Sequence, residues 1–381
     1  MNCTACRLCM ALLVMTLFAG TAAAWDYSVP LVIDHSCSDL DMVPAAWIDS
    51  VQANLRLHYA HTSHGGQLTT GLDRIETAEP EYSVARGYSS LPAEAGAFCI
   101  FDGQEHDTYI TPEEYWQAAA GMNYTRDVLD NNPSINVSMW SWCTQLTYYS
   151  EAQVEAYLDS VSVLETEYPG VVFIYMTNNA QATGSSGYNR FLRNQQIRQH
   201  CISGNRVLFD FADLDSWWFN PVSEEWEHAT YEYEGDSVHV EHPQFNGYQA
   251  GHTTYESCEQ KGKAVWYLMA RLAGWPGATS SVNGEEDHPA RISVEMYPNP
   301  FTSSVTVAYT LREECFTEIS VYDVSGARVR TLMRSEAAPG THRVLWDGAD
   351  TSGGRVASGI YFLSFNLAGA DVRTEKIVLA R

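Results

Sequence analysis

Positive charge is scarce in this sequence. Its 381 residues contain 22 lysines and arginines against 47 aspartates and glutamates, which gives a formal net charge of −25 at pH 7. Nucleic acids and anionic membranes carry the same sign of charge and would repel such a chain, so we expect no nucleic-acid partner. Charged residues make up only 18% of the chain and hydrophobic residues 45%. That composition is typical of a folded globular protein rather than a disordered one.

Long hydrophobic runs are absent beyond the first 24 residues, so the sequence predicts no transmembrane helix there. Within residues 1–24, Arg7 precedes a short apolar run, and Ala22–Ala24 offer a small-residue cleavage site before Trp25. This run is too short to cross a bilayer and is typical of a secretory signal. We predict that residues 1–24 are a signal peptide and that the mature bacterial protein is secreted or attached to the cell surface.

No C-x-x-C pair occurs after the signal, which argues against a structural zinc knuckle. Six cysteines remain in the mature chain, and the sequence leaves their pairing open. They are Cys37, Cys99, Cys143, Cys201, Cys258 and Cys315. We interpret Cys143 as a buried apolar side chain or half of a disulfide rather than as a nucleophile. We expect no cofactor.

Strand and helix patterns alternate between residues 25 and 275. The expected strands are 55–61, 135–142, 171–176 and 207–211, and the expected helices are 153–167, 188–201 and 262–272. The strand at 171–176 is apolar throughout, which is typical of a strand buried on both faces of a parallel sheet. This alternation predicts an α/β domain with helices on both faces of its sheet and a ligand site beyond the carboxyl ends of the strands.

A polar and acidic linker, residues 276–290, separates this domain from a different pattern. Residues 291–381 contain short alternating segments between Gly, Asp and Ser turns, which predicts an all-β sandwich. Its spaced motifs are Tyr297–Phe301, Val321–Gly326, Trp346–Gly348, Ser358–Tyr361 and Lys376–Leu379. These motifs resemble the C-terminal sorting domain of type IX secretion substrates and the Ig-like domain of flagellar hook-capping proteins. The resemblance implies a surface-attachment module whose partner is outer-membrane secretion machinery.

Polar residues follow each expected strand of the first domain. They are Thr62–Gly66, Cys143–Gln145, Thr177–Asn179 and Ala212–Asp215, and Gly251–His252 precede the last helix. Because the carboxyl ends of parallel strands meet at one edge of the sheet, we expect these residues to lie near one another. A serine first, amides in the middle and a histidine last is an order that suits acyl transfer.

This order resembles that of the SGNH (GDSL-type) hydrolases, a flavodoxin-like family of esterases and lipases. Ser63 matches the serine of the family, although His-Thr-Ser replaces the usual Gly-Asp-Ser, and Asn178 matches its asparagine. His252 matches the position of the family histidine before the last helix, while Asp236 and His239 match the usual acid-to-histidine spacing and form the alternative pair. The glycine of the second family block has no clear counterpart. The resemblance implies a three-layer, flavodoxin-like domain with esterase activity.

The resulting hypothesis is a secreted serine hydrolase that acts on ester bonds, with a carbohydrate O-deacetylase as the narrower expectation. Ser63 attacks the ester carbonyl, His252 removes its proton, and Asn178 helps to stabilise the oxyanion. No acid stands three residues before His252, so Asp213, Asp210 or a backbone carbonyl has to orient it. The residues expected to bind the substrate are His64, Gly65, Gln145 and Trp217.

Two other functions stay open. His58, His61 and His64 lie three residues apart and could hold a metal in a metal-dependent hydrolase, although no known zinc motif is present. The departures from the hydrolase pattern also fit a non-catalytic glycan- or surface-binding protein on the same fold. Tryptophans near the strand ends suit the flat faces of sugars, but they equally fill hydrophobic cores.

Overall fold

The computed structural model describes residues 29–104, 107–277, 292–299, 301–311, 315–323, 328–367 and 370–380. The predicted signal peptide at 1–24 lies outside the described residues, and so does most of the predicted linker at 276–290. Within the described ranges, no helix is both long and apolar enough to span a membrane.

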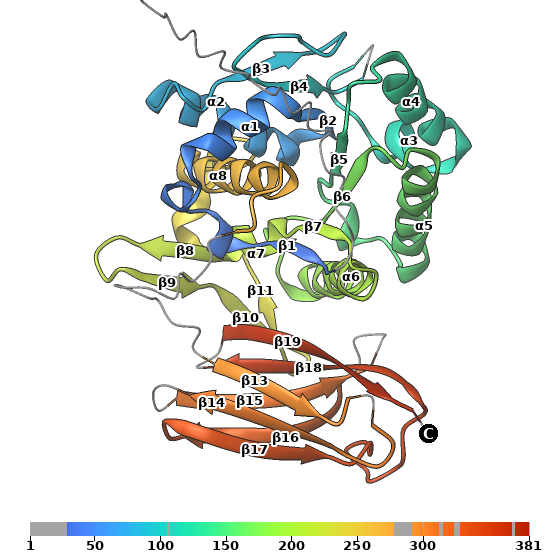
Figure 1. The fold of residues 1–381 in the computed structure, drawn as a ribbon, viewed down its shortest axis with the longest axis vertical. Coiled ribbons are helices and arrows are strands. Elements are labelled where there is room, and N and C mark those ends of the chain that lie inside the picture. Colours follow the sequence, from blue (N-terminus) through green and yellow to red (C-terminus); the bar gives the residue numbers. More distant parts are fainter. Residues whose placement is uncertain are drawn as a thin grey trace, which may run out of the picture.

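A seven-stranded sheet forms the centre of the first domain (Figure 1). Its strands are β1 Leu31–Ile33, β2 Arg56–His61, β3 Val84–Gly87, β4 Phe98–Asp102, β5 Val137–Ser141, β6 Val172–Met176 and β7 Val207–Phe209. Their order across the sheet is β1-β7-β6-β5-β2-β4-β3, and every neighbouring pair is parallel. The predicted parallel α/β architecture is therefore confirmed.

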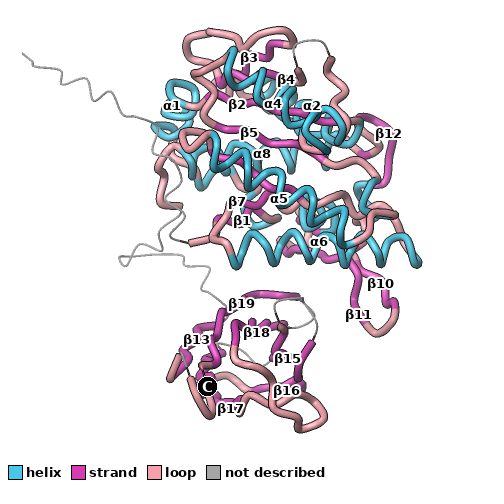
Figure 2. The backbone as a smooth tube through the Cα atoms, turned by 90° about the vertical axis from the view of Figure 1, so that its right-hand side faces the viewer, coloured by secondary structure: helices cyan, strands magenta, loops and turns pink. Residues whose placement is uncertain are grey.

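Helices cover both faces of this sheet, so the domain has three layers (Figures 1 and 2). One layer contains α1 Ala45–Asn54, α2 Gly66–Ala78 and α8 Tyr255–Leu272. The other contains α3 Pro112–Tyr115, α4 Ala118–Asn131, α5 Glu151–Glu167 and α6 Gly184–Ser203. Helix α8 begins earlier than the sequence pattern predicts because the side chain of Thr254 accepts a hydrogen bond from the Ser257 N–H and caps the first turn.

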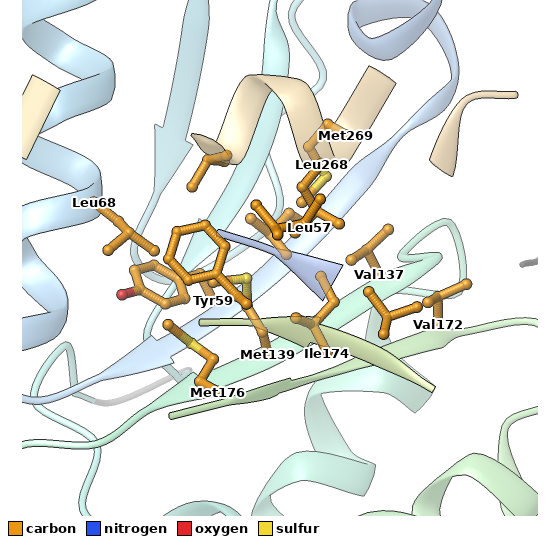
Figure 3. Packing of buried hydrophobic residues seen from close by; sticks show 14 of the residues in the cluster. Leu57, Tyr59, Leu68, Val137, Met139, Val172, Ile174, Met176, Leu268 and Met269 are labelled. Carbon is orange, nitrogen blue, oxygen red and sulfur yellow. The ribbon is translucent and has the colours of Figure 1, made fainter. Parts of the chain in front are cut away.

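Apolar side chains at alternate strand positions form the main core. Figure 3 shows these side chains packed against helices α2 and α8: Leu57 and Tyr59 of β2, Val137 and Met139 of β5, Val172, Ile174 and Met176 of β6, Leu68, Leu268 and Met269. Successive strand residues point to opposite faces, so His58 lies on the other face. The two helices approach closely, because a Cβ on Gly71 of α2 would lie 1.9 Å from the backbone oxygen of Cys258 in α8.

Five short strands and a short helix fill the segment between β7 and α8, where the sequence pattern predicted no regular structure. They are α7 Phe211–Ser216, β8 Trp217–Asn220, β9 Glu225–His228, β10 Thr230–Tyr233, β11 Asp236–His239 and β12 Asn246–Ala250. Strands β8 and β9 form one antiparallel pair, and β10 and β11 form another. The predicted strand 207–211 ends at Phe209 because the side chain of Asp210 caps α7 by accepting a hydrogen bond from the Asp213 N–H.

The C-terminal region is all-β, as predicted. Its strands are β13 Ile292–Tyr297, β14 Val305–Leu311, β15 Cys315–Tyr322, β16 Arg328–Ala337, β17 Gly340–Trp346, β18 Gly359–Leu367 and β19 Ala370–Leu379. They form two antiparallel sheets, β13-β14-β17 and β16-β15-β18-β19. Trp346, Phe365 and Ile377 are fully buried between them, in a core separate from that of the first domain.

Candidate functional site

The candidate site lies where the strand order of the parallel sheet reverses. From β2 the chain continues to β3 and β4 on one side, whereas β5, β6 and β7 lie on the other. In open α/β sheets, ligands bind beyond the carboxyl ends of the strands at this reversal. Ser63 and His64 follow β2 and Cys143 follows β5, so all three residues lie at that position.

Ser63, His64 and Cys143 contact one another. The Sγ atom of Cys143 lies 3.2 Å from Ser63 Oγ and 3.1 Å from His64 Nδ1. His64 is buried, with 4% of its surface exposed, while Ser63 and Cys143 are partly exposed. A sulfur that solvent can reach is thus held against an imidazole that is shielded from solvent.

The turn after β2 depends on Gly65. Residues Ser63–Gly65 form a single 3-10 turn that leads directly into α2. A Cβ on Gly65 would lie 2.3 Å from the Cβ of His61, so a side chain at this position would force the turn away from the strand end. Gly65, predicted to bind the substrate, therefore has a structural reason to be glycine, and it lies beside His64.

Cys143 has the electrostatics of a reactive thiol. Burial raises the pKa of its thiol, but hydrogen bonds with His64 and Ser63 and the charge of His64 outweigh this effect and lower the pKa to about 6. For His64, burial lowers the pKa, but the contact with Cys143 and the hydrogen bond with Gln181 outweigh it, so the pKa is raised. The Cys143 thiol therefore loses its proton below neutral pH, beside an imidazole whose pKa is raised, and the thiolate is the nucleophilic form of cysteine.

Gln181 fixes which nitrogen of His64 faces the sulfur. Its Nε2 donates to Glu241 Oε1 at 2.9 Å and to the backbone oxygen of His252 at 2.8 Å. Its Oε1 therefore points toward His64 Nε2, 2.8 Å away, and accepts the hydrogen that this nitrogen carries. The Nδ1 atom is left to face the Cys143 sulfur, so the orientation of the ring is fixed from its other nitrogen.

The predicted pairing of Ser63 with His252 is not formed. Among the hydrogen bonds of the described residues, the Ser63 hydroxyl contacts Cys143 and none joins it to His252. The imidazole of His252 stacks on that of His64, with ring centroids 4.6 Å apart. His64, rather than His252, is therefore the imidazole in contact with the Cys143 sulfur, and His252 lies against the other imidazole.

The amide residues after β5 and β6 hold the backbone around Cys143. Gln145 Oε1 accepts a hydrogen bond from the Cys143 N–H at 2.7 Å, and Asn179 Nδ2 donates to the Cys143 backbone oxygen. Asn178 is 1% exposed, and its Oδ1 accepts from the Asn179 N–H at 2.7 Å. Asn179, which sequence reasoning did not select, is thus the asparagine in contact with Cys143.

Asp213 and Trp217 lie at the edge of the sheet rather than beside Cys143. Asp213 Oδ1 is 2.6 Å from His35 Nδ1 and accepts a hydrogen bond from the His35 N–H at 2.8 Å. The indole ring of Trp217 stacks on the His35 ring, with centroids 4.3 Å apart. The prediction that Asp213 orients His252 is therefore wrong, because the carboxylate is turned toward His35.

The alternative pair, Asp236 and His239, is not joined either. Asp236 Oδ2 accepts a hydrogen bond from the Tyr188 hydroxyl at 2.8 Å. His239 Nδ1 lies 2.9 Å from Ser216 Oγ and 3.4 Å from His228 Nε2. In strand β11 these two residues have separate partners and form no acid–histidine dyad.

The side chains of His58, His61 and His64 do not converge on a common point in the structure. His58 is fully buried and contacts Ser138 Oγ at 3.0 Å and the Gly103 backbone oxygen at 3.1 Å. His61 Nε2 lies 2.9 Å from Asp102 Oδ1. Since each imidazole has its own partners, the hypothesis of a histidine cluster that holds a metal has no support from the geometry.

Cys143, to which the sequence pattern assigned no nucleophilic role, is a free and partly exposed cysteine in the structure. All six cysteines of the predicted mature chain are free, and those at 37, 99, 201 and 258 are buried. Cys143 differs because it lies two residues after the end of β5, at the same edge of the sheet as Ser63. The sequence signal for Cys143 was its position directly after the predicted strand 135–142. The reactivity of its thiol was not taken into account.

The ionisation of Cys143 can be measured by alkylation. Iodoacetamide reacts with thiolates, so we expect its rate with Cys143 to rise with pH and reach half its maximum near pH 6, because the thiol loses its proton there. In His64→Asn the midpoint should move up toward the ordinary cysteine range. Buried Cys258, whose pKa burial raises to about 11, serves as the unreactive internal control. A midpoint in the ordinary cysteine range for the unmodified protein would contradict the lowered pKa of Cys143.

Comparison with known proteins identifies the C-terminal domain. Residues 281–371 match the FlgD Ig-like domain family, so the chain contains such a domain. FlgD from P. aeruginosa is 18% identical over 23% of this chain and 72% of that chain, with a TM-score of 0.17. FlgD from Xanthomonas campestris is 22% identical over 24% of this chain and 62% of that chain, also at 0.17.

A third similar structure is dimeric latent PorU from Porphyromonas gingivalis. It is 18% identical over 23% of this chain, with a TM-score of 0.21, and this chain covers 9% of its length. PorZ, described as a surface component of the type IX secretion system of Porphyromonas gingivalis, is 23% identical over 23% of this chain, with a TM-score of 0.18 and 11% of its length covered. No curated protein matches the chain.

Proposed function

We propose that the α/β domain is a hydrolase of acyl bonds, acting on esters, in which Cys143 is the nucleophile and His64 the general acid and base. The observation that carries the proposal is the 3.1 Å contact between the Cys143 sulfur and His64 Nδ1 at the carboxyl edge of the sheet. The proposal keeps the ester chemistry that the sequence order favours. It moves the nucleophile from Ser63 to Cys143 because Cys143 is the residue in contact with a base.

The reaction proceeds in two steps. The Cys143 thiolate attacks the ester carbonyl carbon, and the imidazolium of His64 gives its Nδ1 proton to the departing alkoxide, which leaves a thioester and an alcohol. His64 then takes a proton from a water molecule, which attacks the thioester carbonyl. The carboxylic acid leaves, and the released thiolate again faces the protonated imidazole.

Ser63 and Gln181 support these steps from opposite sides. The Ser63 hydroxyl, 3.2 Å from the sulfur, donates a hydrogen bond that stabilises the thiolate. Gln181 holds the His64 ring by its Nε2 side, so that the catalytic nitrogen does not rotate away. Both roles adjust the rate by smaller factors than the nucleophile itself, since one such hydrogen bond contributes about 1.5–3 kcal/mol.

The sheet order supports the flavodoxin-like, SGNH-type interpretation of this domain. The five strands β4-β2-β5-β6-β7 follow one another in the order 2-1-3-4-5 of flavodoxin-like sheets, with β3 and β1 added at the edges. An esterase on this fold places its nucleophile after the first of these strands. In this chain that position belongs to Ser63, while Cys143 follows the third strand of the order.

Export and substrate class rest on the sequence. The signal-like residues 1–24 and the motifs of the C-terminal domain support a secreted or surface-attached protein delivered by outer-membrane secretion machinery, with the domain as a type IX sorting module. An O-acetylated carbohydrate is the ester that we propose for such a protein. Short acyl groups also suit a nucleophile that is only partly exposed.

Trapping of the acyl-enzyme tests the proposal. Purified protein is mixed with p-nitrophenyl acetate, quenched in acid and digested for peptide mass mapping. We expect an acetyl group on the Cys143 peptide and a burst of nitrophenol that matches the protein concentration. His64→Asn is the matched control and should neither burst nor accumulate the adduct.

Three outcomes of this experiment are informative. An acetyl group on Ser63 would return the nucleophile to the serine. No adduct and no turnover, together with retained glycan binding, would favour the non-catalytic binding protein. If acid is released without a covalent adduct, and a chelator abolishes this release, a metal-dependent hydrolase would be favoured.

A further inference from the structure

A second group of polar side chains lies at the ends of β1 and β7, which are separated from β5 by β6. Asp34 and His35 directly follow β1, and Asp213 lies in the first turn of α7. One ligand atom from each of these three residues lies within 4.8 Å of the others. Among the described residues, no other set of three histidines, cysteines or carboxylates is this compact.

The sheet holds the two parts of this group in place. Strands β1 and β7 are parallel neighbours, with Ile33 paired to Phe209. The Asp210 N–H donates to the Ile33 backbone oxygen at 2.8 Å, which continues the pairing to the point where both chains leave the sheet. The three side chains are therefore brought together by backbone hydrogen bonds and do not depend on flexible loops.

Each side chain is also oriented by a neighbour. The Asp34 carboxylate accepts hydrogen bonds from the Ser36 N–H at 3.0 Å and the Ser36 hydroxyl at 2.6 Å. The His35 ring is stacked on Trp217, and the Asp213 carboxylate accepts a hydrogen bond from the His35 backbone N–H at 2.8 Å. Neighbours of this kind fix ligand orientation in metal sites, where the residues behind the ligands are nearly as important as the ligands.

The charge of the group is not balanced. Among the described ion pairs, Asp213 has His35 as its partner and Asp34 has none, while the nearby Arg198 is paired with Asp210 at 2.6 Å. Two carboxylates therefore share one imidazole, which cannot neutralise both even when it is protonated. Partly buried carboxylates that lie this close repel one another, and a cation between them would relieve the repulsion.

We propose that Asp34, His35 and Asp213 bind one divalent transition-metal ion, of the Mn²⁺ or Zn²⁺ class. The ion replaces the proton on His35 Nδ1 and is held by this nitrogen and one oxygen of each carboxylate. Carboxylates alone would suit Mg²⁺ or Ca²⁺, but the imidazole nitrogen favours the transition metals. All three residues are partly exposed, so water molecules complete the coordination shell.

The ion would join the end of β1 to the start of α7. This site shares no residue with the Cys143 cluster, and the inference does not depend on the proposed hydrolase activity. The segment after α7 contains the two hairpins β8–β9 and β10–β11. The first of these strands, β8, begins at Trp217. A metal at Asp213 would therefore fix the base of the segment that follows β7.

Metal titration tests this site. The protein carries Cys143→Ala, so that the thiol cannot bind the metal, and is stripped with a chelator. Mn²⁺ and Zn²⁺ are then titrated by calorimetry, with Mn²⁺ also followed by electron paramagnetic resonance. We expect one ion per chain, and at least a tenfold loss of affinity in Asp213→Asn and in Asp34→Asn. Asp49→Asn, an exposed carboxylate on α1, is the control and should bind as the parent does.

Thermal unfolding separates ligand loss from misfolding. The metal should raise the melting temperature of the parent and of Asp49→Asn in proportion to its binding. Asp213→Asn and Asp34→Asn should unfold cooperatively without metal and gain nothing from it. Equal affinity in the parent and both site variants, or no binding at metal concentrations up to about 1 mM, would overturn the proposal, because a site of three ligands holds such ions far more tightly.

Discussion

Cys143→Ala will abolish ester hydrolysis, whereas Ser63→Ala will only slow it. Removing a nucleophile that acts together with a base costs on the order of 10⁴-fold or more in kcat. Removing one hydrogen bond to the thiolate costs about 10–100-fold, because a hydrogen bond to a charged group contributes about 1.5–3 kcal/mol. The Ser63 oxygen and the Cys143 sulfur are in direct contact. Comparing the rates of the two variants therefore separates the chemical role of one residue from that of the other. Initial rates with p-nitrophenyl acetate provide the measurement.

The pair of variants has a built-in control for folding. Both side chains are small and partly exposed, so neither change should alter the circular dichroism spectrum or the melting temperature appreciably. Ser63→Ala should also shift the alkylation midpoint of Cys143 upward, since the hydroxyl helps to lower the thiol pKa. If instead Ser63→Ala is inactive and Cys143→Ala retains activity, the serine is the nucleophile and the cysteine mechanism is wrong.

Lys261→Met will destabilise the first domain by about 3–5 kcal/mol, the usual cost of leaving one member of a buried ion pair without its partner. Lys261 Nζ and Asp215 Oδ1 lie 2.7 Å apart, and both side chains are fully buried. Asp215 also accepts a hydrogen bond from the Ala180 N–H at 2.9 Å, next to Gln181. Loss of the lysine would leave the Asp215 carboxyl group in the core without this partner. Urea unfolding followed by fluorescence measures the free energy of unfolding.

Lys263→Met is the matched control, because Lys263 lies on the same helix, two residues away, but is exposed. Its change should stay within about 0.5 kcal/mol. The double variant Lys261→Met with Asp215→Leu should recover much of the loss, because a buried ion pair can be replaced by apolar residues at little cost. Equal stability of the two single methionine variants would show that the buried pair contributes nothing.

The sequence predicted the architecture where the hydrophobic pattern was strong. Apolar runs such as 171–176 belong to strands buried on both faces, and α5 and α6 carry clear helical periodicity, so their existence and type followed directly. The strands β8 to β12 escaped prediction because each has only four or five residues, too few for an alternating pattern to stand out from a loop. Helix α8 was longer than predicted because its first turn is set by the Thr254 cap rather than by apolar residues.

The sequence predicted that the residues after the strands lie near one another, but it did not predict which of them are in contact. Residues after β2 and β5 meet at the reversal of the strand order, which follows from topology alone. The choice of partners does not follow, because it depends on which way each side chain turns once the strand has ended. His64 turns toward Cys143, while Asp213 turns toward His35 at the far side of the sheet. The serine-hydrolase pattern starts from Ser63, so it could not reveal that the Cys143 thiol lies between Ser63 and His64.

The contact between Gly71 and Cys258 has a consequence for the precision of the site. Ser63 and His64 lie in the 3-10 turn that leads into α2. His252, which stacks on His64, lies three residues before the first residue of α8. The two helices touch backbone to backbone at Gly71, so their spacing is set by main-chain atoms that cannot repack. An error of about 1 Å in such a geometry costs roughly 100-fold in rate. The absence of a side chain at Gly71 therefore sets the distance between the two helices, and through it the alignment of the residues at the site.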